Sequence, residues 1–398
     1  MRSLPEGSHD TRGGARRGPL LRIGFIDLID AAPLIVALEN GYFAEEGLSV
    51  VLERQLGWGN IRDRLTFGQL DAAHALVGMP LFSRLSREWF VEPLVSLMNL
   101  GSGGNAITLS RRLIEAGVHS ASALAQYIEN DPRHEVMIFG HVFSCSMHHY
   151  LLREWLASGG IDPDQDVRLR VFPPNQLAGH MARGYVEGFC VGEPWNTLAA
   201  RNGAGEIVAV TTDILPGHPE KVLAVSERWL HAHEELAMPM VRAVLRGCAW
   251  CEEERNHSAL AELLARPEYL NTPTDLLRQS LALDRAPARA ASPARSAPAV
   301  VRRTDWRTRS FAPACTFPSR THYAWLVGQM RRWRQLPRDV DAMKVARRCT
   351  DPRAYRAAAA TLGIACPPDD FPPMALRGGV FDPQADAVRD NATEGAIP

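Results

Sequence analysis

Short apolar runs alternate with stretches of helical periodicity along the N-terminal part of the chain. Strands are predicted at Leu21–Leu28, Leu48–Leu52 and Asp71–Val77, where apolar residues run together or alternate with polar ones. Helices are predicted at Ala31–Asn40 and Ile61–Phe67, each followed by a glycine of the kind that ends a helix. The order of strand, helix and strand indicates βαβ units.

The same alternation continues through the middle of the chain. A helix is predicted at Tyr150–Ser158, directly before the pair Gly159-Gly160. Further strands are predicted at Ala106–Leu109, Val136–Phe139, Arg168–Phe172, Gly188–Val191 and Ile207–Thr211. The pattern favours an α/β fold with open parallel sheets and helices on both faces. Two such sheets in one chain predict two lobes, with a ligand site at the strand ends that face the gap.

The two predicted lobes divide the chain unequally. Lobe 2 is predicted at residues 110–212, and lobe 1 is discontinuous, formed by residues 21–109 together with residues 213–370. Residues 1–20 are predicted to be a disordered N-terminus and residues 371–398 a loop-like tail.

The composition changes abruptly between residues 285 and 316. Ala, Pro, Arg and Ser dominate at the start of this segment, and such a stretch cannot bury enough apolar surface to offset the entropy of ordering it. We therefore expect a divergent or disordered insert within lobe 1, either a lineage-specific loop or a local disruption of the reading frame. Folded patterning resumes at Thr321–Trp333, which predicts an amphipathic helix.

Bulk composition is that of a soluble globular chain. Of 398 residues, 46% are hydrophobic and 22% are charged, and the formal net charge is -1, which leaves no electrostatic footprint for nucleic acid or an anionic membrane. Residues 1–22 lack the apolar core of a secretory signal, and no apolar run is long enough to span a bilayer. The sequence therefore predicts a cytoplasmic protein without a membrane span.

The lysines and cysteines indicate which residues could have a chemical role. Lys221 and Lys344 are the only lysines among 44 basic residues, so each is a candidate for a role that arginine does not fill. The seven cysteines show no secreted disulfide pattern. Cys248 and Cys251 form a CxxC pair, which is predicted to be the buried face of an amphipathic helix rather than a redox or metal motif, because no second pair at zinc spacing exists.

Two glycine-containing segments are candidates for lining a ligand site. Trp58 lies between Gly57 and Gly59 ahead of a predicted helix, so it could place its ring on a ligand or serve as a core tryptophan at a tight turn. The loop at residues 99–107 is glycine-rich and contains Asn105, but it lacks the lysine and hydroxyl of a phosphate-binding loop. It is better interpreted as a generic lining loop.

Three further residues stand at predicted element ends. His148 lies where a polar loop enters a helix, so a protonated His148 could bind a small anion, or the residue could be a structural cap. Glu193 follows an apolar strand, and Lys221 precedes another at Val222–Val225, although each could also be a surface turn. Cys145 near His148 lacks an orienting third group, and no other catalytic motif is present, so we predict no enzymatic activity.

These segments, taken in order, resemble one protein family. Gly41–Leu48 (GYFAEEGL) resembles the opening of nitrate/sulfonate/bicarbonate-type substrate-binding proteins. Gly160–Pro163 (GIDP), Val191–Asn196 (VGEPWN) and His218–Leu223 (HPEKVL) resemble the nitrate- and bicarbonate-binding branch, including its cytoplasmic nitrate/nitrite sensors. The resemblance covers residues 21–254 and resumes from Phe317 to Pro368.

The resemblance implies a fold and a ligand. It implies a two-lobed, periplasmic-binding-protein-like fold of type II that holds nitrate or nitrite in the cleft between the lobes. Matching motifs would place four residues among the anion's contacts, with a fifth nearby. The contacts are Trp58, Asn105, His148 and Lys221, and the neighbour is Glu193. Asn105 stands where nitrate binders usually carry glutamine, so its reach is shorter. No cofactor and no metal are implied.

Two roles are compatible with this resemblance. In the first, the chain is a cytoplasmic sensor that controls nitrate assimilation genes through an RNA-binding antiterminator protein, without itself binding nucleic acid. In the second, it is the substrate-binding component of an ABC-type nitrate, bicarbonate or sulfonate importer. A third possibility, a pyrimidine-precursor synthase of the same fold, has no motif support.

Overall fold

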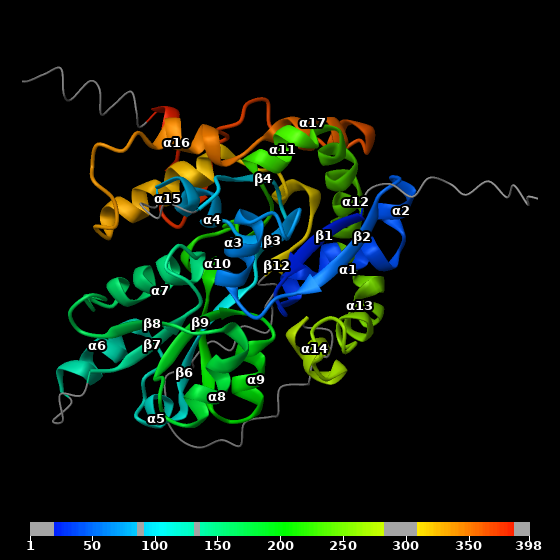
Figure 1. The fold of residues 1–398 in the computed structure, drawn as a ribbon. Helices are drawn as coiled ribbons and strands as arrows, with labels where there is room; N and C mark the ends of the chain where they lie inside the picture. Colours follow the sequence, from blue (N-terminus) through cyan, green and yellow to red (C-terminus); the bar gives the residue numbers. More distant parts are fainter. Residues whose placement is uncertain (1–19, 86–90, 131–135, 282–308, 386–398) are drawn as a thin grey trace, which may run out of the picture.

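The structure is a computed structural model that describes residues 20–85, 91–130, 136–281 and 309–385. The predicted disordered N-terminus therefore lies almost entirely outside the described residues, as do most of the predicted insert at 285–316 and the end of the tail. The limits predicted for the two lobes stay predictions. The structure does show which strands form each of two five-stranded sheets (Figure 1).

The first sheet has the strand order β2-β1-β3-β11-β4. Its strands are β1 (Leu20–Phe25), β2 (Ser49–Arg54), β3 (Ala72–Leu76), β4 (Leu94–Asn99) and β11 (Lys221–Ser226). Strand β1 is parallel to β2 and β3, whereas β11 is antiparallel to both of its neighbours, β3 and β4.

The second sheet has the strand order β10-β6-β9-β7-β8. Its strands are β6 (Asn105–Ser110), β7 (Ile138–His141), β8 (Arg168–Val171), β9 (Gly188–Gly192) and β10 (Gly205–Val210). Strand β7 is parallel to β8 and β9, whereas β6 is antiparallel to β9 and β10. Because β6 begins at Asn105, residues 105–109 belong to the second sheet.

The expectation of parallel sheets was wrong, because both sheets are mixed. The antiparallel members are β6 and β11, the strands that directly follow the two crossings between the sheets. Both are buried along their whole length. A fully buried strand has the same continuous apolar pattern whichever way it runs, so periodicity could not reveal its direction.

Helices cover both faces of each sheet (Figure 1). Their bounds are α1 (Ala32–Glu39), α2 (Tyr42–Glu45), α3 (Trp58–Thr66), α4 (Met79–Leu85), α5 (Arg111–Glu115), α6 (Ala121–Glu129), α7 (Met147–Ser158), α8 (Leu177–Ala182), α9 (Trp195–Arg201), α10 (Thr211–Ile214), α11 (Glu227–Ala232), α12 (Glu234–Glu252), α13 (His257–Leu264), α14 (Thr274–Ser280), α15 (Arg320–Arg332), α16 (Ala342–Cys349) and α17 (Pro352–Thr361). Short 3-10 turns lie at Ile29–Ala31, Pro174–Gln176, Glu254–Asn256 and Pro313–Cys315. The predicted helices at 31–40, 150–158 and 321–333 are confirmed within a few residues.

Side-chain alternation divides the core between the faces of the sheets. On β11, Leu223 and Val225 join the cluster formed with α1 and α12, while Val222 and Ala224 join the cluster formed with α3 and α15. That second cluster also takes in Phe189 of β9 and residues of α7, α8 and α9. The two lobes therefore share one continuous apolar core where they meet.

The chain crosses between the sheets in two segments, residues 99–105 and residues 210–221. The segments run side by side, because the amide of Leu100 donates to the carbonyl of Lys221 over 2.8 Å and that of Gly103 donates to His218 over 3.0 Å. Gly103 and Gly104 have φ of 66° and 94°, the left-handed region in which side chains are strained. The glycine-rich loop thus serves a tight backbone crossing.

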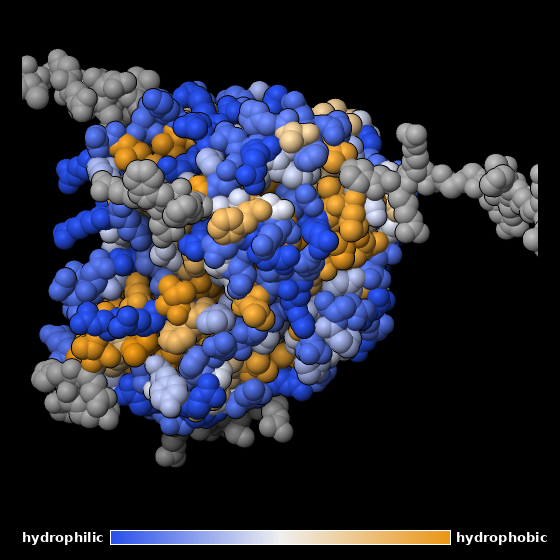
Figure 2. Space-filling model, in the orientation of Figure 1, coloured by the Kyte–Doolittle hydropathy of each residue, from blue (hydrophilic) through white to orange (hydrophobic). Residues whose placement is uncertain are grey.

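Small additions complete the fold. Strand β12 (Arg309–Ser310) pairs with β5 (Ser102–Gly103) at the crossing. Strands β13 (Met374–Leu376) and β14 (Gly379–Phe381) form a hairpin, so the part of the tail around them is not loop-like as predicted. In the described part of the chain, no helix combines the length and the hydropathy that crossing a bilayer requires. Figure 2 shows a largely polar surface on which apolar residues gather near β8.

Close packing between α12 and α1 generates a stability prediction. A Cβ atom built on Gly247 of α12 would lie 2.3 Å from the carbonyl oxygen of Pro33 in α1. We expect Gly247→Ala to lower the free energy of unfolding by about 1–3 kcal/mol, because helix α12 has to move away from α1. Urea unfolding followed by circular dichroism measures this change.

A matched substitution provides the control. Gly328 lies in α15, and a Cβ atom built there would have none of the described residues' atoms within 4 Å. Gly328→Ala is expected to leave stability unchanged or raise it by up to about 1 kcal/mol, because alanine is the better helix former. Equal effects of the two substitutions would contradict close packing at Gly247.

Candidate functional site

A buried group of polar side chains lies where the two crossing segments meet the first sheet. At its centre is Lys221, the first residue of β11, whose side chain is 1% exposed. Its ammonium nitrogen Nζ donates to Oδ2 of Asp30 over 2.9 Å and to Oε1 of Glu220 over 3.0 Å. The same nitrogen lies 5.5 Å from the ring centroid of Trp58, within cation–π distance.

Burial opposes the charge of Lys221, since a desolvated ammonium loses its hydration. The carboxylates of Asp30 and Glu220 outweigh that effect and raise the pKa of Lys221 above its ordinary value. Lys221 is therefore a permanent cation in the folded protein. Two of the three N–H bonds of its ammonium group serve the two carboxylates.

Asp30 is also fixed by a histidine. It lies in the 3-10 turn that follows β1, and its Oδ1 is 2.9 Å from Nε2 of His74 on β3. The other ring nitrogen of His74, Nδ1, accepts from the amide of Ile26 over 3.4 Å. Because Nδ1 accepts, His74 is neutral with its proton on Nε2, and Asp30 accepts as a carboxylate.

Glu220 links the first sheet to residues of the second sheet and of helix α7. Its Oε2 accepts from Nδ2 of Asn105, the first residue of β6, over 2.6 Å. Its Oε1 lies 3.3 Å from Nδ1 of His148, and Oε2 lies 3.7 Å from Nδ1 of His218. Burial raises the pKa of the Glu220 carboxyl, and Lys221 opposes this shift only in part.

His148 lies in the first turn of α7, which is capped by Ser146. Full burial lowers the pKa of His148 well below its ordinary value, and the charge of Lys221 lowers it further. The sequence predicted that a protonated His148 could serve as a charged donor for an anion. The structure instead favours a neutral imidazole, because a second buried cation beside Lys221 would be unfavourable.

Several polar atoms around this network have no hydrogen bond to the described residues. They are Nε1 of Trp58, Oδ1 of Asn105 and both ring nitrogens of His148. Nδ1 of His148 is near Glu220, but its geometry is not that of a hydrogen bond. Buried polar groups are nearly always paired, so unpaired groups gathered at one place indicate a site for a polar ligand.

Glu193 adjoins the network from the end of β9. Its carboxylate accepts from the amide of Thr197 over 3.1 Å and from the hydroxyl of Ser280 over 3.4 Å. Its own amide donates to the carbonyl of Gly104, next to Asn105. The structure thus joins four of the five predicted residues, Trp58, Asn105, His148 and Lys221, through shared contacts, and places the fifth beside them through the backbone.

Similarity to known proteins extends over most of the chain. The NMT1-like family matches residues 15–265, which is more than half of the chain. The chain belongs to the NMT1-like family. This confirms the predicted family, that of nitrate/bicarbonate/sulfonate-type substrate-binding proteins, but not its sensor branch.

Individual relatives of this NMT1-like protein are known. The nitrate/nitrite binding protein NrtA of Synechococcus elongatus is 30% identical over 401 residues, covering 96% of this chain and 88% of that protein. The nitrate import ATP-binding protein NrtC of Synechocystis is 34% identical over 345 residues, covering 86% of this chain but 50% of that protein. The chain therefore spans about half the length of NrtC.

The fold has a close counterpart among solved structures. The crystal structure of the periplasmic nitrate-binding protein NrtA from Synechocystis PCC 6803 superimposes with a TM-score of 0.80 at 25% identity, covering 93% of this chain and 97% of that one. The predicted two-lobed, periplasmic-binding-protein-like fold is confirmed. This structural neighbour is, by its name, a nitrate-binding protein.

Sequence reasoning missed four polar residues of the network. Three of them, Asp30, His74 and Glu220, form hydrogen bonds with one another or with Lys221. The fourth is His218, whose Nε2 shares a hydrogen bond of 2.9 Å with the hydroxyl of Thr211. His74 lies within an otherwise apolar strand, which is a signal, because a buried histidine needs a partner. Glu220 appeared only within the His218–Leu223 motif and was given no role, although a carboxylate beside a rare lysine is the natural counter-ion.

The cysteines that the sequence analysis singled out supply no reactive group to this site. Burial raises the pKa of the Cys145 thiol to about 12, so it is not a nucleophile at neutral pH. Cys248 and Cys251 are buried on α12, which confirms the predicted apolar helix face. Over the ranges that the structure describes, no group of His, Cys, Asp and Glu side chains is arranged to hold a metal ion.

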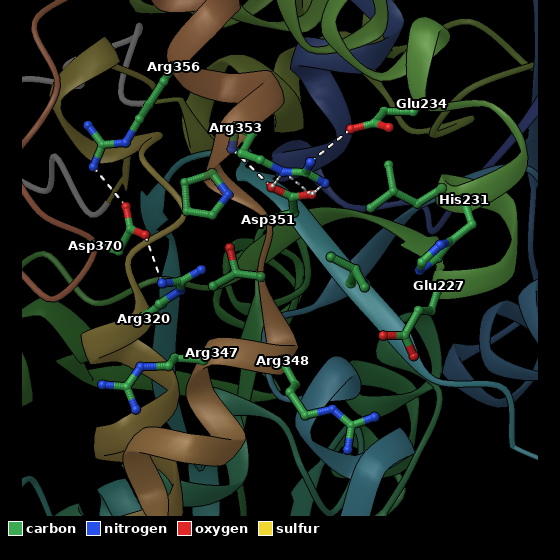
Figure 3. A pocket seen from close by; sticks show the side chains of 14 residues that line it. Glu227, His231, Glu234, Arg320, Arg347, Arg348, Asp351, Arg353, Arg356 and Asp370 are labelled. Carbon is green, nitrogen blue, oxygen red and sulfur yellow. Dashed lines mark hydrogen bonds and ion pairs between the residues drawn. The ribbon is translucent and has the colours of Figure 1, made fainter.

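A separate cavity of about 500 Å³ lies among α11, α15, α16 and α17 (Figure 3). Its lining contains five arginines, at 320, 347, 348, 353 and 356. Asp370 pairs with Arg320 and Arg356, each over 2.8 Å, and Asp351 pairs with Arg353. Much of its positive charge is thus compensated internally, and none of the five predicted site residues lines it.

Buried histidines make stability depend on pH. Burial lowers the pKa of His218 and of His141 to about 4, so both are neutral in the folded protein. The unfolded chain binds protons at these residues near pH 6.5, whereas the folded chain does so near pH 4. Their contribution is therefore complete above about pH 6.5 and is lost as the pH falls toward about 4, by up to about 3 kcal/mol for each histidine.

Substitution of His218 tests this dependence. Thermal unfolding measured across this pH range should depend less steeply on pH in His218→Gln than in the wild type. His231→Gln, at an exposed histidine of α11, should keep the wild-type slope. An unchanged slope in His218→Gln would show that the residue is not buried in its neutral form.

Proposed function

We propose that this chain binds nitrate or nitrite between its two sheets, at the network centred on Lys221. The observation that supports this most directly is the gathering of unpaired buried polar atoms around a permanent cation. A small oxyanion needs a cation and several in-plane hydrogen-bond donors, and it tolerates an aromatic wall. The names of its relatives, a nitrate/nitrite binding protein among them, support the same ligand class.

Each residue has a role in this proposal. The ammonium of Lys221 supplies the charge and its third N–H. The indole Nε1–H of Trp58 and a ring N–H of His148 are donors that the described residues leave unpaired. Asn105 contributes its amide from the second sheet, so an anion bound here would contact both lobes. Glu193 holds the crossing loop in place through Gly104.

Replacing the central lysine tests the site. In Lys221→Met, we expect affinity for nitrate and nitrite to fall by at least about a hundredfold, because the anion loses its cation while two carboxylates remain. Isothermal titration with nitrate, nitrite, bicarbonate and sulfate measures the change. Circular dichroism and thermal unfolding verify that the variant is folded.

The other lysine of the chain is the matched control. Lys344 is exposed on α16, outside the network around Lys221, and Lys344→Met should bind like the wild type. Wild-type affinity in folded Lys221→Met would contradict the proposed site. Absence of binding by the wild type to all four anions would contradict the proposed function.

Two biological roles use such a binding event. The names of the relatives favour the binding component of an ABC-type importer. The resemblance noted in the sequence supports the other role, a cytoplasmic sensor that controls nitrate assimilation genes through a partner antiterminator. In either role, the anion must bind the closed arrangement of the lobes better than the open one.

Gene deletion distinguishes the two roles. Loss of growth on scarce nitrate, with normal induction of the assimilation genes once nitrate is abundant, would support the importer. Loss of induction at abundant nitrate, with normal nitrate uptake, would support the sensor. In the sensor case, the purified chain should also bind the antiterminator and release it when nitrate is added.

A further inference from the structure

The network around Lys221 carries more negative than positive charge. Lys221 contributes one positive charge, while Asp30 and Glu220 each contribute one negative charge. His74 is neutral because its Nδ1 accepts from a backbone amide. These residues therefore form a buried group with one net negative charge, which is unusual for a site that receives an anion.

Among the described residues, the titratable groups that face Glu220 leave this balance unchanged. These groups are Lys221 on β11, Asp30 after β1, His148 on α7, His218 before β11 and Cys190 on β9. Burial keeps both histidines neutral, and it raises the pKa of the Cys190 thiol well above its ordinary value. None of them supplies a second positive charge.

Glu220 also occupies donors that an entering anion would use. Its carboxylate accepts one N–H of Lys221 and, over 2.6 Å, the amide group of Asn105. A nitrate placed here would stand beside two carboxylates in a buried site and would compete with one of them for donors. Such an arrangement is strongly unfavourable unless one carboxylate loses its charge.

Of the two carboxylates, Glu220 is the one that can accept a proton. Asp30 accepts from both Lys221 and His74, and these two donors favour its charged form. Glu220 has the ammonium on one oxygen, but its other oxygen faces only the neutral amide of Asn105 and the neutral ring of His218. Its raised pKa agrees with this difference.

We propose that the site takes up one proton with each nitrate that it binds, and that Glu220 carries this proton. The inference rests on the proposed function and adds that each nitrate enters the site together with one proton. A protonated Glu220 leaves the site with Lys221, Asp30 and the anion, which together carry one net negative charge. The total charge is then the same before and after binding.

The side chain of Asn105 would transmit this change. While Glu220 is ionised, Nδ2 of Asn105 must donate to it, so Oδ1 is left unpaired. Once Oε2 of Glu220 carries a proton, that hydroxyl can donate to Oδ1 after the amide turns over. Nδ2 then becomes free to donate to the anion. Protonation therefore pairs the buried oxygen and releases a donor at the same time.

The same charge balance excludes doubly charged oxyanions. Sulfate would need a second proton to keep the charge constant, and Asp30 is not available for it because of its two donors. The site is therefore selective for singly charged oxyanions by charge as well as by size.

Titration calorimetry with sodium nitrate tests the coupling. Wild-type protein is titrated in buffers of different ionisation enthalpy between about pH 6.5 and about pH 8.5, a range in which proton uptake appears as a buffer-dependent heat. We expect uptake that approaches one proton per nitrate, and affinity that falls by up to about tenfold for each pH unit. Sulfate should give no binding heat where nitrate saturates the protein.

Replacing Glu220 with its neutral isostere isolates the proton. Glu220→Gln should bind nitrate with buffer-independent heat and with affinity that is flat across this pH range, tighter than the wild type at the upper end. Glu115→Gln, at an exposed glutamate of α5, should behave like the wild type. Circular dichroism confirms that both variants are folded.

The outcomes separate this inference from the proposed function. Nitrate binding by the wild type without proton uptake would overturn the coupling and leave the function intact. Proton uptake that persists in Glu220→Gln would overturn the assignment to Glu220, as would sulfate binding as tight as nitrate binding. Absence of nitrate binding by the wild type would overturn both proposals.

Discussion

The ion pairs of Lys221 with Asp30 and Glu220 fix the geometry on which the rest of the site depends. An isolated ammonium this deeply buried would be very costly, and the two carboxylates are what make it tolerable. Asp30 comes from the turn after β1 and Lys221 from the start of β11, so the pair joins two strand ends of the first sheet. Glu220, which binds Lys221, also accepts a hydrogen bond from Asn105 of the second sheet and lies beside His148 of α7. One buried cation thus links the core of one lobe to the polar edge of the other.

Lysine suits this position better than arginine, in a chain whose basic residues are almost all arginine. An ammonium presents three donors on a compact atom, whereas a guanidinium is a planar fork that tends to engage a carboxylate through two donors at once. A guanidinium already bound to two carboxylates would have few N–H groups left to donate to a ligand. The arginine cavity near α16 shows the alternative, in which Asp370 lies between two arginines at the surface. There the charges largely satisfy one another.

Sequence patterns predicted much of the fold and part of the site, for identifiable reasons. Strands such as β1 and β3, and helices such as α7, are local features that apolar periodicity reports. The directions of β6 and β11 were missed, because direction depends on how the chain crosses between the sheets. Trp58, Asn105, His148 and Lys221 stood in motifs with recognisable composition. Asp30 did not, and His74 in its apolar strand indicated only that a partner must exist. Their partners are residues of distant segments, which only the fold brings within hydrogen-bond distance.

The unpaired atoms of the network have a thermodynamic meaning of their own. Each buried donor or acceptor without a partner costs about 1–3 kcal/mol relative to a paired one. The indole of Trp58, the oxygen of Asn105 and the ring of His148 together hold such a deficit. The folded core maintains it, because α3, β6 and α7 are fixed by apolar packing that does not depend on these atoms. A ligand that pairs these atoms recovers this free energy, so a partly unsatisfied site can bind a small ion that offers few contacts of its own.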